Sequence, residues 1–78
     1  MNRFQNKITL NICEMVFIKD PNSSELGRNI VKGSIDLIDE LGFEDFTFKK
    51  LSKGISSTEA SIYRYFESKH HLLSYLIL

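Results

Sequence analysis

The sequence predicts an all-α fold: a helix-turn-helix head of three to four helices, of the homeodomain-like kind, preceded by a short extended or β arm. Three observations support it. Apolar residues recur at helical spacing over 26–41, two short helical patterns over 47–65 are joined by a Ser/Gly turn, and another helical pattern follows Ser68. The 78-residue length allows one domain at most, which we divide into an arm (1–20) and a helical domain (21–78).

Residues 1–20 show no helical period. Ile8, Leu10 and Ile12 alternate with polar residues, and a short apolar run follows at 15–18. We interpret this as one or two short strands. Because a lone hairpin is barely stable in water, such strands need a partner, either the helical body or a second copy of the chain. The alternative is a frayed arm.

The first helix is expected over about 23–41, after Pro21 has ended the arm. Asn22 or Ser24 can cap its start, and Gly42 suits a left-handed stop. Its apolar stripe is expected to comprise Leu26, Ile30, Val31, Ile35, Leu37, Ile38 and Leu41.

The second helix is expected to run from the N-cap Thr47 to about Lys53, with Leu51 inward and the lysines outward. Three aromatic side chains near its start are expected to fill the core rather than bind a ligand: Phe43, Phe46 and Phe48.

The third helix is expected over about 58–65, after a break at Gly54. Two caps are possible. If Ser56 is the cap, Glu59 can fold back and close a capping box; if Thr58 is the cap, Glu59 is the first helical residue and is free.

The fourth helix is expected to begin after the cap Ser68 and to turn four apolar residues inward: Leu72, Leu73, Leu76 and Ile77. The apolar pattern continues to Leu78 without a stop signal. This indicates either a fragment of a longer protein or a last turn that packs on another subunit.

Charge is distributed unevenly, although the net charge is zero. Residues 1–46 hold five basic and eight acidic side chains, whereas residues 47–78 hold five basic and two acidic ones. This is a weak hint of a basic binding face in the second half. A single cysteine and the lack of an apolar stretch of ~20 residues predict a cytoplasmic protein without a membrane span.

The stretch 58–69 offers what a protein needs to contact duplex DNA. The third helix begins with small or polar side chains: Ala60 can touch a thymine methyl, Ser61 several base edges, and Glu59 a cytosine amino group. Three nearby side chains can donate hydrogen bonds to phosphates, namely Tyr63, Tyr65 and Lys69. The alternative is an ordinary trihelical scaffold in which the two tyrosines are half-buried packing residues.

The same stretch resembles the N-terminal DNA-binding domain of TetR-family transcriptional repressors. The resemblance covers about residues 26–75 and is specific, since the block I-Y-R-Y-F-E-S-K is hard to obtain by chance. The matching residues are Thr47, Leu51-Ser52, Ile62-Tyr63, Tyr65-Phe66, Ser68-Lys69 and Leu72-Leu73, with Leu41-Gly42-Phe43 before them.

The resemblance implies a homodimeric repressor that binds palindromic operator DNA. It implies base contacts by Lys49, Glu59, Ala60 and Ser61, and phosphate contacts by Thr47, Tyr63, Tyr65 and Lys69. The family's C-terminal half, which binds the inducer and forms most of the dimer interface, is expected to be absent, and the inducer is unknown. Strands in the arm would then be a possible substitute dimer contact.

The turn departs from the family pattern, which has Gly-Val-Ser where this chain has Ser56-Ser57-Thr58. Serine in place of glycine predicts a tighter turn at Gly54 or some strain at Ser56. Serine in place of valine predicts weaker packing between the second and third helices.

Other chemistry is weakly represented. His70 and His71 are adjacent on a helix and point about 100° apart, so they cannot share a metal ion. No glycine-rich phosphate loop or Ser/His/Asp grouping occurs, and we expect no enzyme, metal or cofactor. The alternative to DNA binding is a small protein-interaction or dimerisation module on the same helical scaffold.

Overall fold

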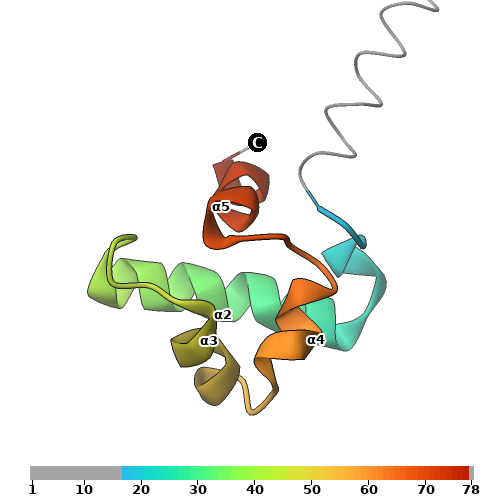
Figure 1. The fold of residues 1–78 in the computed structure, drawn as a ribbon, viewed down its shortest axis with the longest axis horizontal. Coiled ribbons are helices and arrows are strands. Elements are labelled where there is room, and N and C mark those ends of the chain that lie inside the picture. Colours follow the sequence, from blue (N-terminus) through green and yellow to red (C-terminus); the bar gives the residue numbers. More distant parts are fainter. Residues whose placement is uncertain (1–16, 78) are drawn as a thin grey trace, which may run out of the picture.

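The computed structural model describes residues 17–77. All regular secondary structure within these residues is helical. A 3-10 turn, η1 (Pro21–Ser23), leads into the long helix α2 (Glu25–Leu41), followed by α3 (Phe48–Gly54), α4 (Glu59–Tyr63) and α5 (Lys69–Ile77). Figure 1 shows α3 and α4 below α2, with α5 above it. The all-α prediction is confirmed.

The predicted strands fall mostly on residues 1–16, which lie outside the described residues. The remaining arm residues, 17–20, have no regular secondary structure. They nevertheless touch the helical body, because the Ile18 amide donates to the Tyr65 carbonyl over 2.7 Å and the Phe17 ring meets the Tyr75 ring edge-on.

Helix α2 begins two residues later than predicted. Ser24 is its N-cap and accepts a hydrogen bond from the Gly27 amide, so of the two predicted caps the structure selects Ser24. Asn22 instead belongs to η1, which is capped by Asp20. Gly42 ends the helix with a φ of 85°, in the left-handed range expected for this stop.

The α3–α4 turn resolves both alternatives left by the sequence. Thr58 is the N-cap of α4 and accepts from the Ser61 amide over 3.2 Å, so Glu59 is the first helical residue. Ser56 has a φ of 56°, a left-handed conformation that a residue with a Cβ adopts only at a cost. The predicted strain therefore lies at Ser56, while Gly54 remains helical.

Helix α4 is shorter than the predicted 58–65, because the chain tightens after Tyr63. The Arg64 and Tyr65 amides bond to carbonyls three residues back, those of Ser61 and Ile62, as in a 3-10 turn.

In α5 the Ser68 hydroxyl accepts from the His71 amide, in agreement with its predicted capping role. The inward prediction holds for Leu72, which is fully buried. It is wrong for Ile77, which is 73% exposed.

One hydrophobic core joins all four α-helices. Its buried members are Ile30, Phe46, Phe48, Leu51, Ile62, Tyr65, Phe66 and Leu72. Two of the three predicted core aromatics, Phe46 and Phe48, are in this set. Ile35 of the predicted α2 stripe instead faces solvent. Gly33 allows the α3 side of the core to approach α2 closely, since a Cβ there would lie 2.8 Å from an Ile55 methyl group.

Candidate nucleic-acid interface

A surface groove runs between the start of α3, the exposed side of α4 and the start of α5. Five of the eight predicted site residues line it: Thr47, Lys49, Glu59, Tyr63 and Lys69. Phe48 and Ser68 complete the lining. We call this surface the α3–α4 groove. Side chains separated by up to 22 positions in the sequence thus share one surface, as a DNA-contacting surface requires.

Two N-cap residues fix where α3 and α4 begin, and so determine which side chains lie near the groove. The Thr47 hydroxyl accepts from the Lys50 amide over 3.1 Å and starts α3. Thr58 starts α4 in the same way. A capping side chain lies beside free backbone N–H groups, so each helix start also presents hydrogen-bond donors near the surface.

The exposed side of α4 carries the remaining base-contact candidates. Glu59 and Ala60 are exposed, and Ser61 is half-buried. The Ser61 and Thr58 hydroxyls are 2.9 Å apart and hydrogen-bonded. These small side chains would allow the backbone of α4 to approach the bases in the major groove of DNA.

Tyr63 combines an anchored ring with an accessible surface. Its ring lies edge-on to Phe48 with 5.0 Å between centroids, and the residue is 49% exposed. A tyrosine held in this way offers a phenolic hydroxyl at low conformational cost. Its position therefore suits the predicted hydrogen bond to a phosphate.

Tyr65 differs from Tyr63, since it is 2% exposed and belongs to the core. Its hydroxyl is hydrogen-bonded to the Ser24 hydroxyl over 2.7 Å, and the Lys19 ammonium lies 5.2 Å from its ring centroid. The Ser24 hydrogen bond is the main cause that lowers the pKa of the Tyr65 phenol, and burial opposes it. This burial argues against the predicted phosphate contact by Tyr65 and favours the packing alternative.

Lys69 lines the groove, but its ammonium is occupied. The Nζ atom donates to the carbonyls of Phe43 (2.9 Å), Glu44 (3.2 Å) and Phe46 (3.0 Å). It also lies 4.7 Å from the centroid of the Phe43 ring. This arrangement could not be predicted from the sequence, because the acceptors are backbone groups 23 to 26 positions away.

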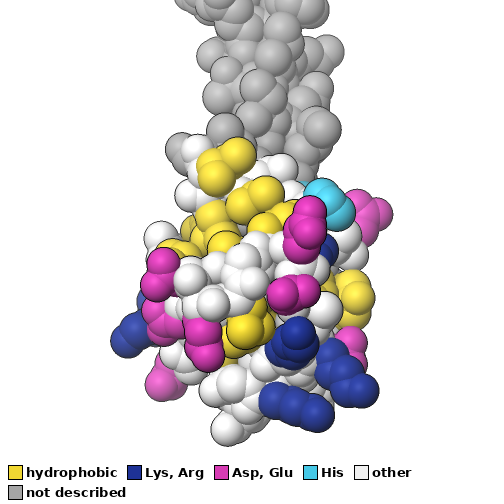
Figure 2. All heavy atoms as spheres, turned by 90° about the vertical axis from the view of Figure 1, so that its left-hand side faces the viewer, with side chains coloured by type: hydrophobic (Ala, Val, Ile, Leu, Met, Phe, Trp, Pro, Cys, Tyr) yellow, Lys and Arg dark blue, Asp and Glu magenta, His cyan; other side chains and the backbone are white. Residues whose placement is uncertain are grey.

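The positive charge of the second half of the chain is presented mainly by α3. Lys49, Lys50 and Lys53 are all exposed, and Lys50 also donates to the Asp45 carbonyl. Figure 2 shows Lys and Arg side chains gathered at the lower right of one face, with acidic side chains above them and to their left.

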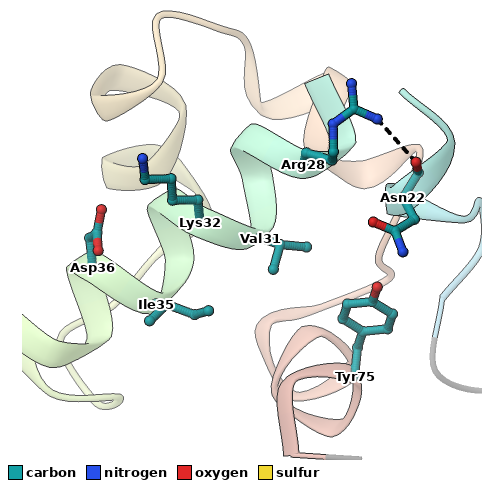
Figure 3. A pocket seen from close by; sticks show the side chains of 7 residues that line it. All are labelled: Asn22, Arg28, Val31, Lys32, Ile35, Asp36 and Tyr75. Carbon is teal, nitrogen blue, oxygen red and sulfur yellow. Dashed lines mark hydrogen bonds between the residues drawn. The ribbon is translucent and has the colours of Figure 1, made fainter. Parts of the chain in front are cut away.

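A second hollow lies between α2 and α5 and contains none of the predicted site residues. Val31, Ile35 and Tyr75 provide its apolar lining, and the Arg28 guanidinium donates to the Asn22 carbonyl at its edge (Figure 3). The hollow is therefore distinct from the α3–α4 groove.

Comparison with protein-family models gives one decisive match. Residues 30–76 match the model for bacterial regulatory proteins of the tetR family, which is more than half of the chain. The chain belongs to the TetR family.

This TetR-family chain therefore contains the helix-turn-helix DNA-binding domain of a family of transcriptional regulators. Helices α3 and α4 are the two helices of the motif. Regulators of the TetR family are generally DNA-binding proteins rather than enzymes. The matched residues include all eight predicted site residues. No curated protein and no solved structure matches the TetR-family chain significantly.

The match begins inside α2, whereas the structure ties earlier residues to the motif. Ser24 and Ile18 lie outside the matched residues, and both are hydrogen-bonded to Tyr65 at the end of the motif. Among residues 17–77 of the TetR-family chain, no helix has the length and hydrophobicity needed to cross a membrane. Within the same part of the chain, no three His, Cys, Asp or Glu side chains cluster as metal ligands.

Proposed function

We propose that the chain is a transcriptional repressor that contacts operator DNA with α4 in the major groove. The observation that carries this proposal is the α3–α4 groove, in which candidate base contacts and candidate phosphate contacts from α3 and α4 line one surface. A DNA-binding surface needs both kinds, since phosphate contacts fix the pose and base contacts select the sequence.

Base selection is assigned to the start of α4 and to Lys49 of α3. Glu59 can accept from a cytosine amino group, Ala60 can contact a thymine methyl group, and Ser61 can bond to several base edges. Because Thr58 rather than Ser56 caps α4, the Glu59 carboxylate is not needed for a capping box with Ser56. A carboxylate weakens general attraction to phosphates, so Glu59 acts in sequence selection.

The phosphate contacts are assigned to Thr47 and Tyr63, which flank the base-contacting helix. Both line the groove, and the half-exposed Tyr63 ring is supported by Phe48. Tyr65 is left out because it is buried, and Lys69 because its ammonium already has three acceptors. This set is smaller than the one expected from the family resemblance.

The repressor acts in the cytoplasm as a homodimer on a palindromic operator. Two copies of a short helix-turn-helix contact two half-sites about one helical turn apart, so the symmetry of the operator matches that of the protein. The duplex that binds best in a selection from random DNA should therefore be palindromic, and sedimentation should give two chains per duplex.

The deciding experiment is a fluorescence-anisotropy titration of mixed duplex, followed by the selected operator, over a salt series from ~50 mM. Affinity should fall with salt by about 0.9 log units per log unit for each phosphate neutralised, and the exposed lysines of α3 are the cations proposed to neutralise them. Tyr63→Phe should weaken binding about fivefold, which corresponds to one lost hydrogen bond of ~1 kcal/mol. It should leave the salt slope unchanged, since a neutral hydroxyl displaces no counterion.

The matched control is Lys32→Ala, an exposed lysine that lines the separate α2–α5 hollow. It should bind like the wild type. For specificity, Glu59→Gln should strengthen binding to mixed duplex and change the preferred operator sequence. Absence of wild-type binding at ~50 mM salt would reject the proposal and favour the protein-interaction module.

A further inference from the structure

We propose that Lys69 is a positioning residue, which fixes the α2–α3 connection (42–47) against the start of α5 and so places the DNA-contacting residues of α3. This rests on the proposed function, because the effect is exerted on Thr47 and Lys49. It assigns to Lys69 a role different from the phosphate contact expected from the sequence.

The first argument is the number of hydrogen bonds that the side chain can make. A lysine ammonium has three protons and no acceptor. All three have acceptors here, the Phe43, Glu44 and Phe46 carbonyls, at 2.9, 3.2 and 3.0 Å. The Phe43 ring, 4.7 Å from Nζ, adds a cation–π contact. A phosphate oxygen could be bonded only by giving up one of these partners.

The second argument is that few other donors reach the three carbonyls. They come from four consecutive residues of a connection that has no regular secondary structure. Within 43–46, the Phe46 amide donates to the Phe43 carbonyl over 3.2 Å, and the other hydrogen bonds to the carbonyls of this segment come from the side chains of Lys50 and Lys69. The Lys69 ammonium therefore supplies the donors that hold these carbonyls in one arrangement.

The third argument links the ammonium to the DNA-contacting surface through one peptide unit. The Phe46 carbonyl that Lys69 binds is directly followed by Thr47, the N-cap of α3. The Phe46 ring on the same residue is fully buried and edge-on to Phe48. A shift of this carbonyl would thus move Thr47 and the first turn of α3, which carries Lys49.

The position of Lys69 also requires compensation. It is the first residue of α5, where the helix dipole disfavours a positive charge. The three carbonyl dipoles offset this effect, and they do so only while the α2–α3 connection remains in place. The side chain therefore links the connection to α5.

The test compares Lys69→Met and Lys69→Arg with Lys49→Met by anisotropy over a salt series, at a temperature where circular dichroism shows each variant to be folded. Lys69→Met should weaken binding about tenfold at every salt concentration, which corresponds to the loss of roughly two hydrogen bonds to DNA from misplaced side chains. The salt slope should stay at the wild-type value. Lys49→Met should lower the slope. Lys69→Arg should not restore affinity, because a planar guanidinium does not match three converging carbonyls.

A spectroscopic measurement separates positioning from folding stability. In DNA-free protein, Lys69→Met should shift the NMR amide signals of Phe46, Thr47 and Lys49 while the signals of α4 stay in place. Full DNA affinity of the folded Lys69→Met variant would overturn the inference. So would a salt slope lowered by about 0.9 together with restoration by arginine, which is the signature of a phosphate contact.

If Lys69→Met does not fold, the wild-type protein still provides a test. Its Lys69 ammonium should keep scalar couplings to carbonyl carbons with and without DNA. A coupling to a phosphate phosphorus in the complex would refute the positioning role. If the wild-type protein binds no DNA, the proposed function is wrong. If the wild-type protein binds DNA and Lys69→Met lowers only the salt slope, the positioning role is wrong and the proposed function stands.

Discussion

Gly27→Ala tests how η1 packs against the first turn of α2. Gly27 is buried in the first turn of α2, where η1 packs against it. A Cβ on this residue would lie 2.2 Å from the Pro21 carbonyl oxygen, 2.6 Å from its Cα and 2.7 Å from its carbonyl carbon. All three are backbone atoms, so no side-chain rotation can relieve the clash.

The expected net loss is about 2 kcal/mol of unfolding free energy. Overpacking of a well-packed site costs typically 1–3 kcal/mol, and a shift of more than 1 Å would also disturb nearby hydrogen bonds. The alanine gains up to ~1 kcal/mol of helix propensity in return. In a domain of this size each kcal/mol corresponds to roughly 4–8 °C, so the melting temperature should fall by about 8–16 °C.

The assay is thermal and urea unfolding followed by circular dichroism at 222 nm. The matched control is Gly54→Ala at the end of α3, where no atom lies within 4 Å of the added Cβ. This variant should be unchanged or slightly more stable, because only helix propensity changes. If Gly27→Ala is as stable as Gly54→Ala, the close packing of η1 on α2 is wrong.

Four variants test the turn, the two tyrosines and the cap of α4. Ser56→Gly should raise the unfolding free energy in urea by up to ~1 kcal/mol, because glycine removes the strain at a φ of 56°; a loss of stability would contradict that conformation. Tyr65→Phe should cost about 1 kcal/mol in the same assay through the lost Ser24 hydrogen bond and leave the salt slope of DNA binding unchanged, whereas Tyr63→Phe should reduce DNA affinity at unchanged stability. The opposite pattern would restore Tyr65 as the phosphate contact. Thr58→Ala should lower the unfolding free energy by about 1 kcal/mol, since the Ser61 amide loses its capping acceptor. An unchanged urea midpoint would indicate that Ser56, not Thr58, is the N-cap of α4.

The sequence alone was sufficient for most of the fold. Helix positions follow from apolar spacing and from caps, which act within three or four residues of themselves, as at Thr47, Ser68 and Gly42. Such local interactions are visible in a linear pattern. The alternatives at Ser56 and Thr58 stayed open because both residues have a hydroxyl at workable spacing, and the turn geometry selects between them.

The sequence also determined the family and the DNA-binding class, since both depend on the order of residues in one contiguous stretch. Only the tertiary structure distinguished Tyr63 from Tyr65, two neighbouring residues of the same type. Tyr65 is bonded to Ser24, 41 positions earlier, and Lys69 to carbonyls 23 to 26 positions earlier. Whether a polar side chain is free to bind DNA depends on what already occupies it, and those partners are brought together only by the packing of the helices.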